Sequence, residues 1–356
     1  ETPNLPMHVT SICIYDPSTA DGGIVRFKDI LKSYANAAEQ SSVLRRRLLH
    51  VPVNLDYPYW VDDPELDMEF HVRHISLPKP GDWRQFHIQA ARLHSLPLDR
   101  SRPLWEAYMI EGLNRIEGLP KSSFALLLKI HHSAIDGVSG AGIVTAIHSV
   151  NNEIDAPVID TWQGENEPSA FQVWSRAYLR NLQRPVKFVE TVGSLVPAIL
   201  RAREASPNPT HGRRKMLTAK TRFNASISNN RITDTLVMDL DEVKSIRKAL
   251  GDFTINDIVV AVIGGAVRKY LQAKGELPDD SLFAGAPVNV RNELSSASTG
   301  NQMSLIRIDM ATNIAAPLER LQVVHESAQQ SKAFANTLGA SVMMNISEMV
   351  VPQAIG

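Results

Sequence analysis

The first 150 residues alternate between strand-like and helix-like patterns of apolar residues. Apolar residues recur at close to every second position over residues 7–15, which predicts a strand. A loop rich in Asp, Pro and Gly follows, and residues 27–39 then repeat apolar positions at helical spacing. The same criteria predict strands over 70–77, 105–112 and 124–131, helices over 83–95 and 137–149, and irregular chain over 48–64. This order of elements is typical of a mixed α/β domain.

A second set of elements begins near residue 218. The pattern predicts strands over 233–240, 282–290 and 303–310, and helices over 241–250, 254–274 and 317–334. Asp241 is the expected N-cap of the first of these helices, and Gly251 follows its end. Both halves run strand, helix, then two strands and a helix. We therefore expect two related lobes, over 1–153 and 218–356, joined by a helical linker over 154–217.

The linker is strongly basic. Ten basic and two acidic residues lie between 174 and 220, so this segment carries a net charge of +8 and the rest of the chain −9. Trp174, Tyr178 and Leu182 recur at every fourth position, the spacing of one helix face. Three interpretations stay open: a basic amphipathic element on an anionic membrane surface, an interlobe helix pair with a solvated basic side, or a groove for a phosphorylated cofactor.

Composition narrows the class of protein. Hydrophobic residues make up 44% and charged residues 21% of the chain, as in globular proteins. The net charge of −1 argues against a dedicated nucleic-acid binder. Cys13 is the single cysteine, so an internal disulfide is excluded, and its apolar setting predicts a small buried side chain. Uncharged apolar stretches fall short of the roughly 18–20 residues that span a bilayer, and we expect a cytoplasmic protein without a signal peptide.

The strongest chemical signal is the sequence His-His-Ser-Ala-Ile-Asp-Gly at 131–137, at the end of an apolar strand. Neighbouring side chains on a strand point in opposite directions, so His131 and His132 do not form one pair of metal ligands. A neutral imidazole accepts a proton near pH 7, which makes one of them a candidate general base and the other its support. Asp136 is placed to orient the loop, and Gly137 permits close approach of backbone or ligand.

The competing interpretation is that both histidines are ordinary residues at the end of a strand. Two His, an Asp and a Gly in this order make that interpretation less favoured than it would be for one His. The sequence contains no Gly-x-Ser-x-Gly elbow, phosphate-binding loop or dinucleotide fingerprint. A serine-hydrolase or nucleotide-driven mechanism therefore has no motif behind it.

Residues 131–137 match the HHxxxDG signature of the acyl-CoA-dependent acyltransferase superfamily, which includes chloramphenicol acetyltransferase and condensation domains. Further segments fall in a distinctive order: Pro-Met-His-Val at 6–9, Pro-Leu-Trp at 103–105, Asn-Asp at 256–257, Pro-Val-Asn-Val-Arg at 287–291 and Gly-Asn-Gln at 300–302. Together they resemble the bacterial wax ester synthase/diacylglycerol acyltransferase family over nearly the whole chain. Chains of that family normally continue well past Gly356.

The resemblance implies a fold of two chloramphenicol-acetyltransferase-like lobes with a substrate tunnel between them. It also implies transfer of a fatty acyl group from acyl-CoA, as co-substrate, to a long-chain alcohol or to diacylglycerol, without a permanently bound cofactor. His132 is then the general base and His131 supports it. The chain would work on the inner membrane face or on lipid inclusions, with no obligatory protein partner.

The resemblance assigns weaker roles to other residues. Asn256, at a helix N-terminus, is the candidate oxyanion donor, although capping alone also explains it. Asp136 resembles the superfamily's structural aspartate, which pairs with an arginine, and Arg291 is the expected partner. Asp257 is expected to be structural. Four residues are candidates for tunnel lining, with core packing as the alternative: Trp105, Leu338, Gly339 and Ala340. The rival functions are a condensation-type enzyme that uses carrier-bound donors and a lipid-binding protein without activity.

Overall fold

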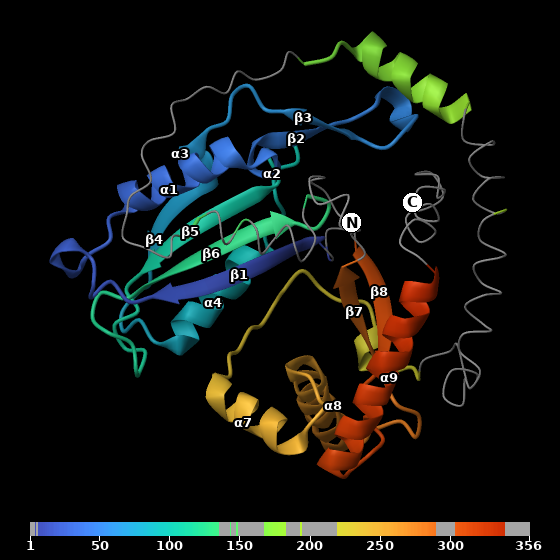
Figure 1. Cartoon of the computed structure of the whole chain (residues 1–356). Coiled ribbons are helices and arrows are strands. Elements are labelled where there is room, and N and C mark those ends of the chain that lie inside the picture. Colours follow the sequence, from blue (N-terminus) through green and yellow to red (C-terminus); the bar gives the residue numbers. More distant parts are fainter. Residues whose placement is uncertain are drawn as a thin grey trace.

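The chain folds into two bodies, each built around a sheet, with a further two-stranded hairpin on the first, as Figure 1 shows. The computed structural model describes residues 4, 6–134, 143, 147–148, 167–182, 193, 219–289 and 303–338, and every structural statement below concerns these residues. The first body is a four-stranded sheet with helices on both faces, and the second is a two-stranded sheet with three helices. The mixed α/β prediction is confirmed. The lobe boundaries at 153 and 217 stay a prediction.

The strand that carries the histidines lies inside the first sheet. The four strands are β1 (His8–Tyr15), β4 (Val72–Ser76), β5 (Trp105–Glu111) and β6 (Phe124–His131). Their order is β1-β6-β5-β4, with β6 antiparallel to both neighbours and β4 parallel to β5. β6 is apolar on both faces because both faces of a central strand are covered.

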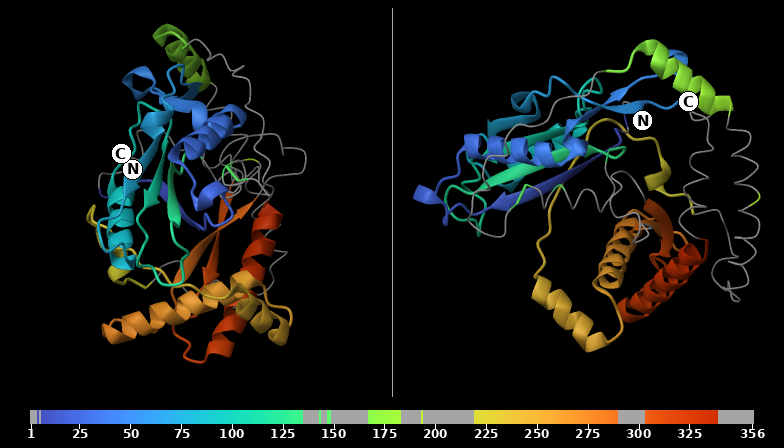
Figure 2. Two further views of the ribbon diagram at one scale, coloured as in Figure 1. Left: turned by 90° about the vertical axis from the view of Figure 1, so that its left-hand side faces the viewer. Right: turned by 45° about the horizontal axis from the view of Figure 1, so that its top comes forward.

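Helix α1 (Phe27–Gln40) covers one face of this sheet and α4 (Trp83–Ser95) the other, as the views in Figure 2 show. Side chains alternate between the faces along β6. Phe124, Leu126, Leu128 and Ile130 pack in the cluster that contains α1 residues. Ala125 and Leu127 instead pack in the cluster that contains α4 residues. The strand therefore joins two hydrophobic cores.

A small hairpin lies beside α1. β2 (Arg46–Leu49) and β3 (Tyr59–Asp62) pair antiparallel, between the short helices α2 (Ser42–Arg45) and α3 (Met68–His71). The prediction of irregular chain over 48–64 was therefore wrong for the strand residues in that range. Pro and Asp in the connection, which includes the turn Pro52–Asn54, hid the strand pattern. The helix over residues 170–182 packs on this hairpin.

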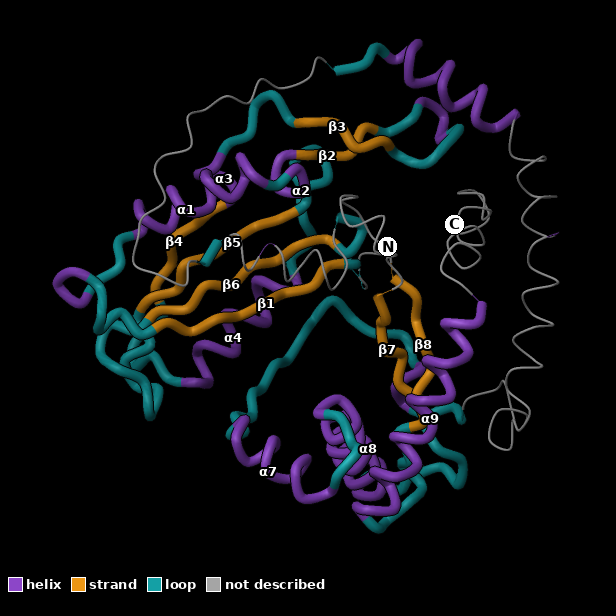
Figure 3. The backbone as a smooth tube through the Cα atoms, viewed as in Figure 1, coloured by secondary structure: helices purple, strands orange, loops and turns teal. Residues whose placement is uncertain are grey.

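In the second body, β7 (Phe283–Asn289) and β8 (Met303–Asp309) pair antiparallel, and three helices complete the body (Figure 3). The helices are α7 (Leu240–Leu250), α8 (Ile255–Ala273) and α9 (Pro317–Leu338). Gly264 of α8 lies so close to β8 that a Cβ atom there would stand 2.2 Å from the carbonyl oxygen of Met310. A side chain at this position would therefore push the helix away from the residue that follows β8.

Two predictions in the second half were wrong. Residues 233–239 form no strand but run as exposed extended chain, and Thr233 Oγ1 donates to His87 O of α4 at 3.2 Å. The alternation of apolar residues was real, but among the described residues no partner strand pairs with this segment. The N-cap of α7 is Asp239, not Asp241, because Asp239 Oδ1 accepts from the amides of Asp241 and Glu242.

The remaining predicted elements agree with the structure within a few residues, apart from the helix over 137–149, which lies outside the described residues. Cys13 is half-buried and has no disulfide partner. In the described part of the chain, no helix by itself has the length and apolarity needed to cross a membrane. The pair α7 and α8, bent by 104°, meets that test only when taken together.

Candidate active site

The two histidines stand where three sequence motifs meet. The amide of His131 donates to Leu104 O at 2.9 Å, and the amide of His132 donates to Met7 O at 2.7 Å. Met7 belongs to the Pro-Met-His-Val segment and Leu104 to the Pro-Leu-Trp segment. Two segments far away in the sequence therefore fix the backbone on both sides of the strand end.

The two imidazoles have different surroundings. His131 Nδ1 lies 2.7 Å from Ser133 Oγ and accepts from the amide of Ser133 at 3.1 Å. These contacts hold His131 in a local turn at the end of β6. His132, one residue later, is exposed. The more exposed of the two histidines is thus the one that the signature assigns as the base.

Beneath the strand end lies a buried charge cluster that we call the Lys129 cluster, made of Lys129, Glu106, Tyr108 and Arg73. Lys129 is fully buried, and its Nζ lies 3.0 Å from Glu106 Oε2. It also donates to the carbonyl oxygens of Leu93 and Leu96 at 3.1 and 3.0 Å. These are orphan carbonyls at the C-terminus of α4, where a cation is favourable. Lys129 therefore fastens β6 to α4.

Glu106 is in turn satisfied by two further groups of the cluster. Tyr108 OH donates to Glu106 Oε2 at 2.7 Å, and Arg73 Nη2 lies 3.7 Å from Oε1. Burial lowers the pKa of Lys129, while the Glu106 carboxylate acts in the opposite direction. The buried charges of Lys129 and Glu106 are thus offset by each other and by their hydrogen bonds to neighbouring groups.

His8 of β1 supports the same helix end. It is the cross-strand neighbour of His131, and its Nε2 donates to His94 O at 2.5 Å. His94 Nδ1 lies 2.7 Å from Thr10 Oγ1. Burial lowers the pKa of His8 to about 4, so this imidazole is neutral near pH 7. β1, β5 and β6 together therefore place polar groups under the last turn of α4.

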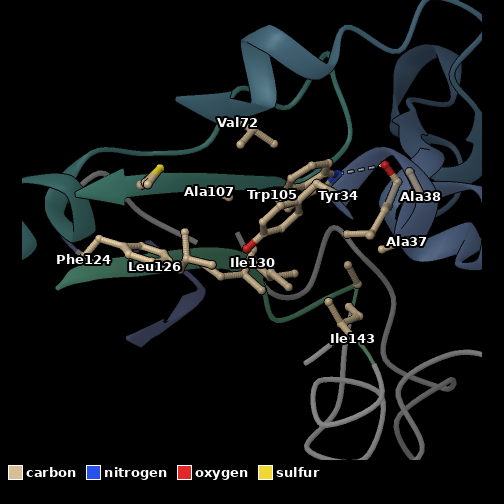
Figure 4. Packing of buried hydrophobic residues seen from close by; sticks show 14 residues of the cluster. Tyr34, Ala37, Ala38, Val72, Trp105, Ala107, Phe124, Leu126, Ile130 and Ile143 are labelled. Atoms are coloured by element: carbon tan, nitrogen blue, oxygen red, sulfur yellow. Dashed lines mark hydrogen bonds between the residues drawn. The ribbon is translucent and has the colours of Figure 1, made fainter. Parts of the chain in front are cut away.

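Trp105 is a core residue of the first body, as Figure 4 shows. Its indole Nε1 donates to Leu44 O at 2.8 Å, and its ring stacks on Tyr34 and His71 with centroids 5.7 and 4.6 Å away. His71 Nδ1 also donates to Trp105 O at 2.7 Å. These contacts support the packing role of Trp105, and its place in a tunnel wall stays a prediction.

In the second body, Asn256 and Asp257 occupy the first turn of α8. Thr254 is the N-cap: its Oγ1 accepts from the Asp257 amide at 3.2 Å, and Asp257 Oδ2 accepts from the Thr254 amide at 2.8 Å. His325 Nδ1 of α9 donates to the same Oδ2 at 2.8 Å. Asp257 is therefore buried in a clamp between two helices, and its structural role stays a prediction that these contacts support, while Asn256 is exposed.

The hydrogen bonds to Asp257 determine its protonation. Burial by itself raises the pKa of this carboxyl, but the bonds from His325 and Thr254 outweigh burial and hold the pKa below its ordinary value. Asp257 is thus a carboxylate near pH 7 and can accept from both partners. Within the described residues, Asn256 makes no hydrogen bond with His132.

Several predicted site residues lie outside the described residues: Asp136, Gly137, Arg291, Gly339 and Ala340. Leu338 is the last residue of α9, and its side chain is not described. The Asp136–Arg291 pair and the tunnel lining near 338–340 therefore stay predictions. Among the described side chains, no group of three or more His, Cys, Asp or Glu residues is placed to hold a metal ion.

The sequence analysis did not identify the buried residues that hold the two motifs, namely the Lys129 cluster at the histidines and His325 at the start of α8. A sequence signal for the Lys129 cluster was present, because Lys129 and Glu106 each interrupt an apolar strand and a charge in such a strand needs a buried partner. Pairing of β5 with β6 places the two opposite each other. His325 had no such signal, because its spacing in α9 does not identify what it contacts.

Comparison with known proteins agrees with these motifs. Residues 1–259 match the profile of the wax ester synthase/diacylglycerol acyltransferase catalytic domain, and residues 299–356 match the C-terminal domain of the same family. A protein of Mycobacterium tuberculosis, named as a candidate diacylglycerol O-acyltransferase, is 32% identical over 96% of this chain and 66% of its own length. The O-acyltransferase WSD of Acinetobacter baylyi is 31% identical over 82% of this chain and 62% of its own length.

Solved structures show the same fold. The wax ester synthase/diacylglycerol acyltransferase of Marinobacter aquaeolei VT8 has a TM-score of 0.61 at 24% identity, over 100% of this chain and 76% of its own. The first condensation domain of the calcium-dependent antibiotic synthetase has a TM-score of 0.54 at 13% identity, over 96% of this chain and 73% of its own. The chain spans about two thirds of the length of the Mycobacterium tuberculosis and Acinetobacter baylyi relatives. With the profile matched over both halves, the chain belongs to the wax ester synthase/diacylglycerol acyltransferase family.

Proposed function

We propose that the protein transfers a long-chain fatty acyl group from acyl-CoA to the hydroxyl of a long-chain alcohol or of diacylglycerol. The observation that carries this proposal is the exposed His132 at the end of a buried strand, where Met7 O accepts from its amide and Leu104 O accepts from the amide of His131. A base held on a rigid element keeps its orientation toward a substrate. The names of the relatives support the choice of acyl group and acceptors.

In the proposed reaction, His132 takes the proton of the acceptor hydroxyl as its oxygen attacks the thioester carbonyl. The tetrahedral intermediate carries a negative oxygen, for which the exposed Asn256 amide at the start of α8 is the proposed donor. Collapse of the intermediate breaks the carbon–sulfur bond and forms the ester. The imidazolium of His132 then returns its proton to the departing thiolate of CoA. Acyl-CoA is a co-substrate, and no resident cofactor takes part in this scheme.

We further propose that the protein works at a lipid surface, on a membrane or a lipid inclusion. Both acceptors are too apolar to be delivered from water at useful concentrations. The basic segment over 174–220, which overlaps the helix over 170–182, has the charge that anionic lipids attract.

The test is release of free thiol from palmitoyl-CoA, with and without hexadecanol, by the full-length protein. Wild type is expected to release thiol only with the alcohol, and His132→Ala is expected to lose about 10²–10⁴-fold in kcat. His50→Ala, which changes an exposed histidine away from the site, is the matched control and should keep its rate.

Other results select the rival functions. Turnover of a carrier-bound acyl group but not of free acyl-CoA would identify a condensation-type enzyme, whose fold this chain shares. Binding of fatty ligands without turnover, equally by wild type and His132→Ala, would identify a lipid-binding protein.

A further inference from the structure

The helix over residues 170–182 presents an apolar surface to solvent in the described structure. Five large side chains of this helix are exposed, and Phe171 is the most open at 75%. At 100° per residue they fall within one arc of the helix, which we call the apolar arc. Its members are Phe171, Trp174, Tyr178, Leu179 and Leu182. An arc of five large apolar side chains is more than the scattered exposed residues of an ordinary surface.

The opposite side of the helix fixes the direction of this arc. Val173 and Ala177 are buried in a cluster with Val51 of the β2–β3 hairpin. One turn further on, Asn181 Nδ2 donates to Leu55 O at 2.8 Å. The helix is therefore docked on the hairpin through one face, and the apolar arc is held outward.

Further contacts hold the helix in place. Ser169 Oγ accepts from the Gln172 amide at 3.3 Å, and Gln172 Oε1 accepts from the Ser169 amide at 2.9 Å, which completes a capping box at the N-terminus. Arg180 Nη1 lies 3.9 Å from Asp56 Oδ2 of the hairpin connection. The surface is thus preformed, so a partner that binds it does not have to order the helix first.

Charge and residue type identify the partner. From residue 168 to residue 189 the chain has four basic residues, Arg176, Arg180, Arg184 and Lys187, and no acidic one. Arg176 is exposed and lies next to Leu179 around the helix, beyond one edge of the arc, whereas Arg180 lies on the side that faces the hairpin. Trp174 and Tyr178 stack with centroids 5.4 Å apart. An outward helix face with aromatic and aliphatic side chains, flanked by an arginine, is typical of helices that lie in the boundary between lipid head groups and acyl chains.

We propose that the apolar arc is a docking surface for an anionic phospholipid bilayer, with Phe171, Trp174 and Leu179 inserted and Arg176 on the head groups. This inference rests on the proposed function, which requires a lipid surface, and it names the face that meets it. Figure 1 shows the helix over 170–182 on the far side of the hairpin from α7, α8 and α9. Docking there leaves the second body clear of the bilayer.

The test is sedimentation of the full-length protein with phosphatidylcholine vesicles, with and without phosphatidylglycerol. Phe171→Glu/Leu179→Glu is expected to weaken binding by at least about tenfold, because each large apolar side chain withdrawn from water contributes about that factor or more. Arg176→Glu is expected to weaken binding about five- to tenfold on vesicles with phosphatidylglycerol and to leave binding to pure phosphatidylcholine unchanged. Leu318→Glu, at an exposed apolar position on α9, is the control and should bind like wild type.

Two results would overturn the docking surface. The first is wild-type vesicle binding by Phe171→Glu/Leu179→Glu. The second is intact vesicle binding by that variant together with a changed mass in solution or a changed unfolding temperature. A changed mass would mean that a second copy covers the arc, and a changed unfolding temperature would mean that another part of the polypeptide covers it. Transfer from a soluble short-chain acyl-CoA separates this proposal from the proposed function. The double variant should retain that transfer. If wild type shows no transfer but its vesicle binding still depends on the arc, the proposed function is refuted and the docking surface is not.

Discussion

The two motifs of the candidate site are held in place by different kinds of chemistry. The strand end with His131 and His132 rests on a buried lysine–glutamate pair and on a neutral buried histidine. The helix start with Asn256 and Asp257 rests on a capping box and on one hydrogen bond from the neighbouring helix. Removing one partner of a buried charge pair costs about 3–5 kcal/mol, whereas a cap contributes about 1 kcal/mol and a part-buried hydrogen bond about 1–3 kcal/mol. The comparison therefore predicts a rigid base and a more easily displaced oxyanion donor.

The largest effect is expected from Lys129→Met. This change removes the buried cation that lies closest to Glu106, leaves that carboxylate with only Tyr108 and the partly exposed Arg73, and frees the carbonyls at the end of α4. The free energy of unfolding in urea should fall by about 3–5 kcal/mol. Lys121→Met, at an exposed lysine, is the control and should change little. If Lys129→Met loses less than about 1 kcal/mol, the Lys129 cluster does not anchor the strand.

The second effect is a dependence of stability on pH in the first body. The folded-state pKa of His8 is about 4, below its ordinary 6.5, so the unfolded chain binds more protons between these values. Stability should therefore be lost as pH falls from about 6.5 to about 4, by about 3 kcal/mol. His8→Gln, whose amide can still donate to His94 O, should flatten the curve of unfolding free energy against pH. An unchanged curve would contradict the burial of a neutral His8.

A smaller effect, at lower pH, is expected for the second body. The pKa of Asp257 is held below its ordinary 3.8, so its contribution is present above that pH and is lost as pH falls through the lowered value. His325→Ala should cost about 1–3 kcal/mol near neutral pH. A double-mutant cycle with Asp257→Asn measures the coupling between the two side chains. Additive losses would show that the clamp does not couple α8 to α9.

The smallest effect is expected from Thr254→Ala, which removes the N-cap of α8. The loss should be about 1 kcal/mol in unfolding free energy, and Thr254→Ser should retain most of the stability. Because the cap sits two residues before Asn256, kcat is expected to fall more than KM rises for Thr254→Ala. A loss of stability as large as that of Lys129→Met would remove the difference between the two anchors.

The sequence alone predicted most of the elements, and it singled out the histidine pair as the candidate site. Helix α4 spans Trp83–Ser95, as its apolar period and Asp82 predict, because caps and periodicity act within a few residues. The apolar strand before His131 was equally plain, since its two faces are both buried. The HHxxxDG signature, together with the ordered segments around it, showed the resemblance to the family before any contact was known.

The tertiary structure decided what holds the motifs in place. The β2–β3 hairpin, the unpaired chain over 233–239 and the clamp of His325 on Asp257 depend on which distant segments meet. Met7 and Leu104 converge on the histidines only because β1 and the start of β5 flank β6 in one register. Local propensity determines a helix or a strand within a few residues. Register, and with it the partner of a buried charge such as Lys129, is determined only when the whole sheet is assembled.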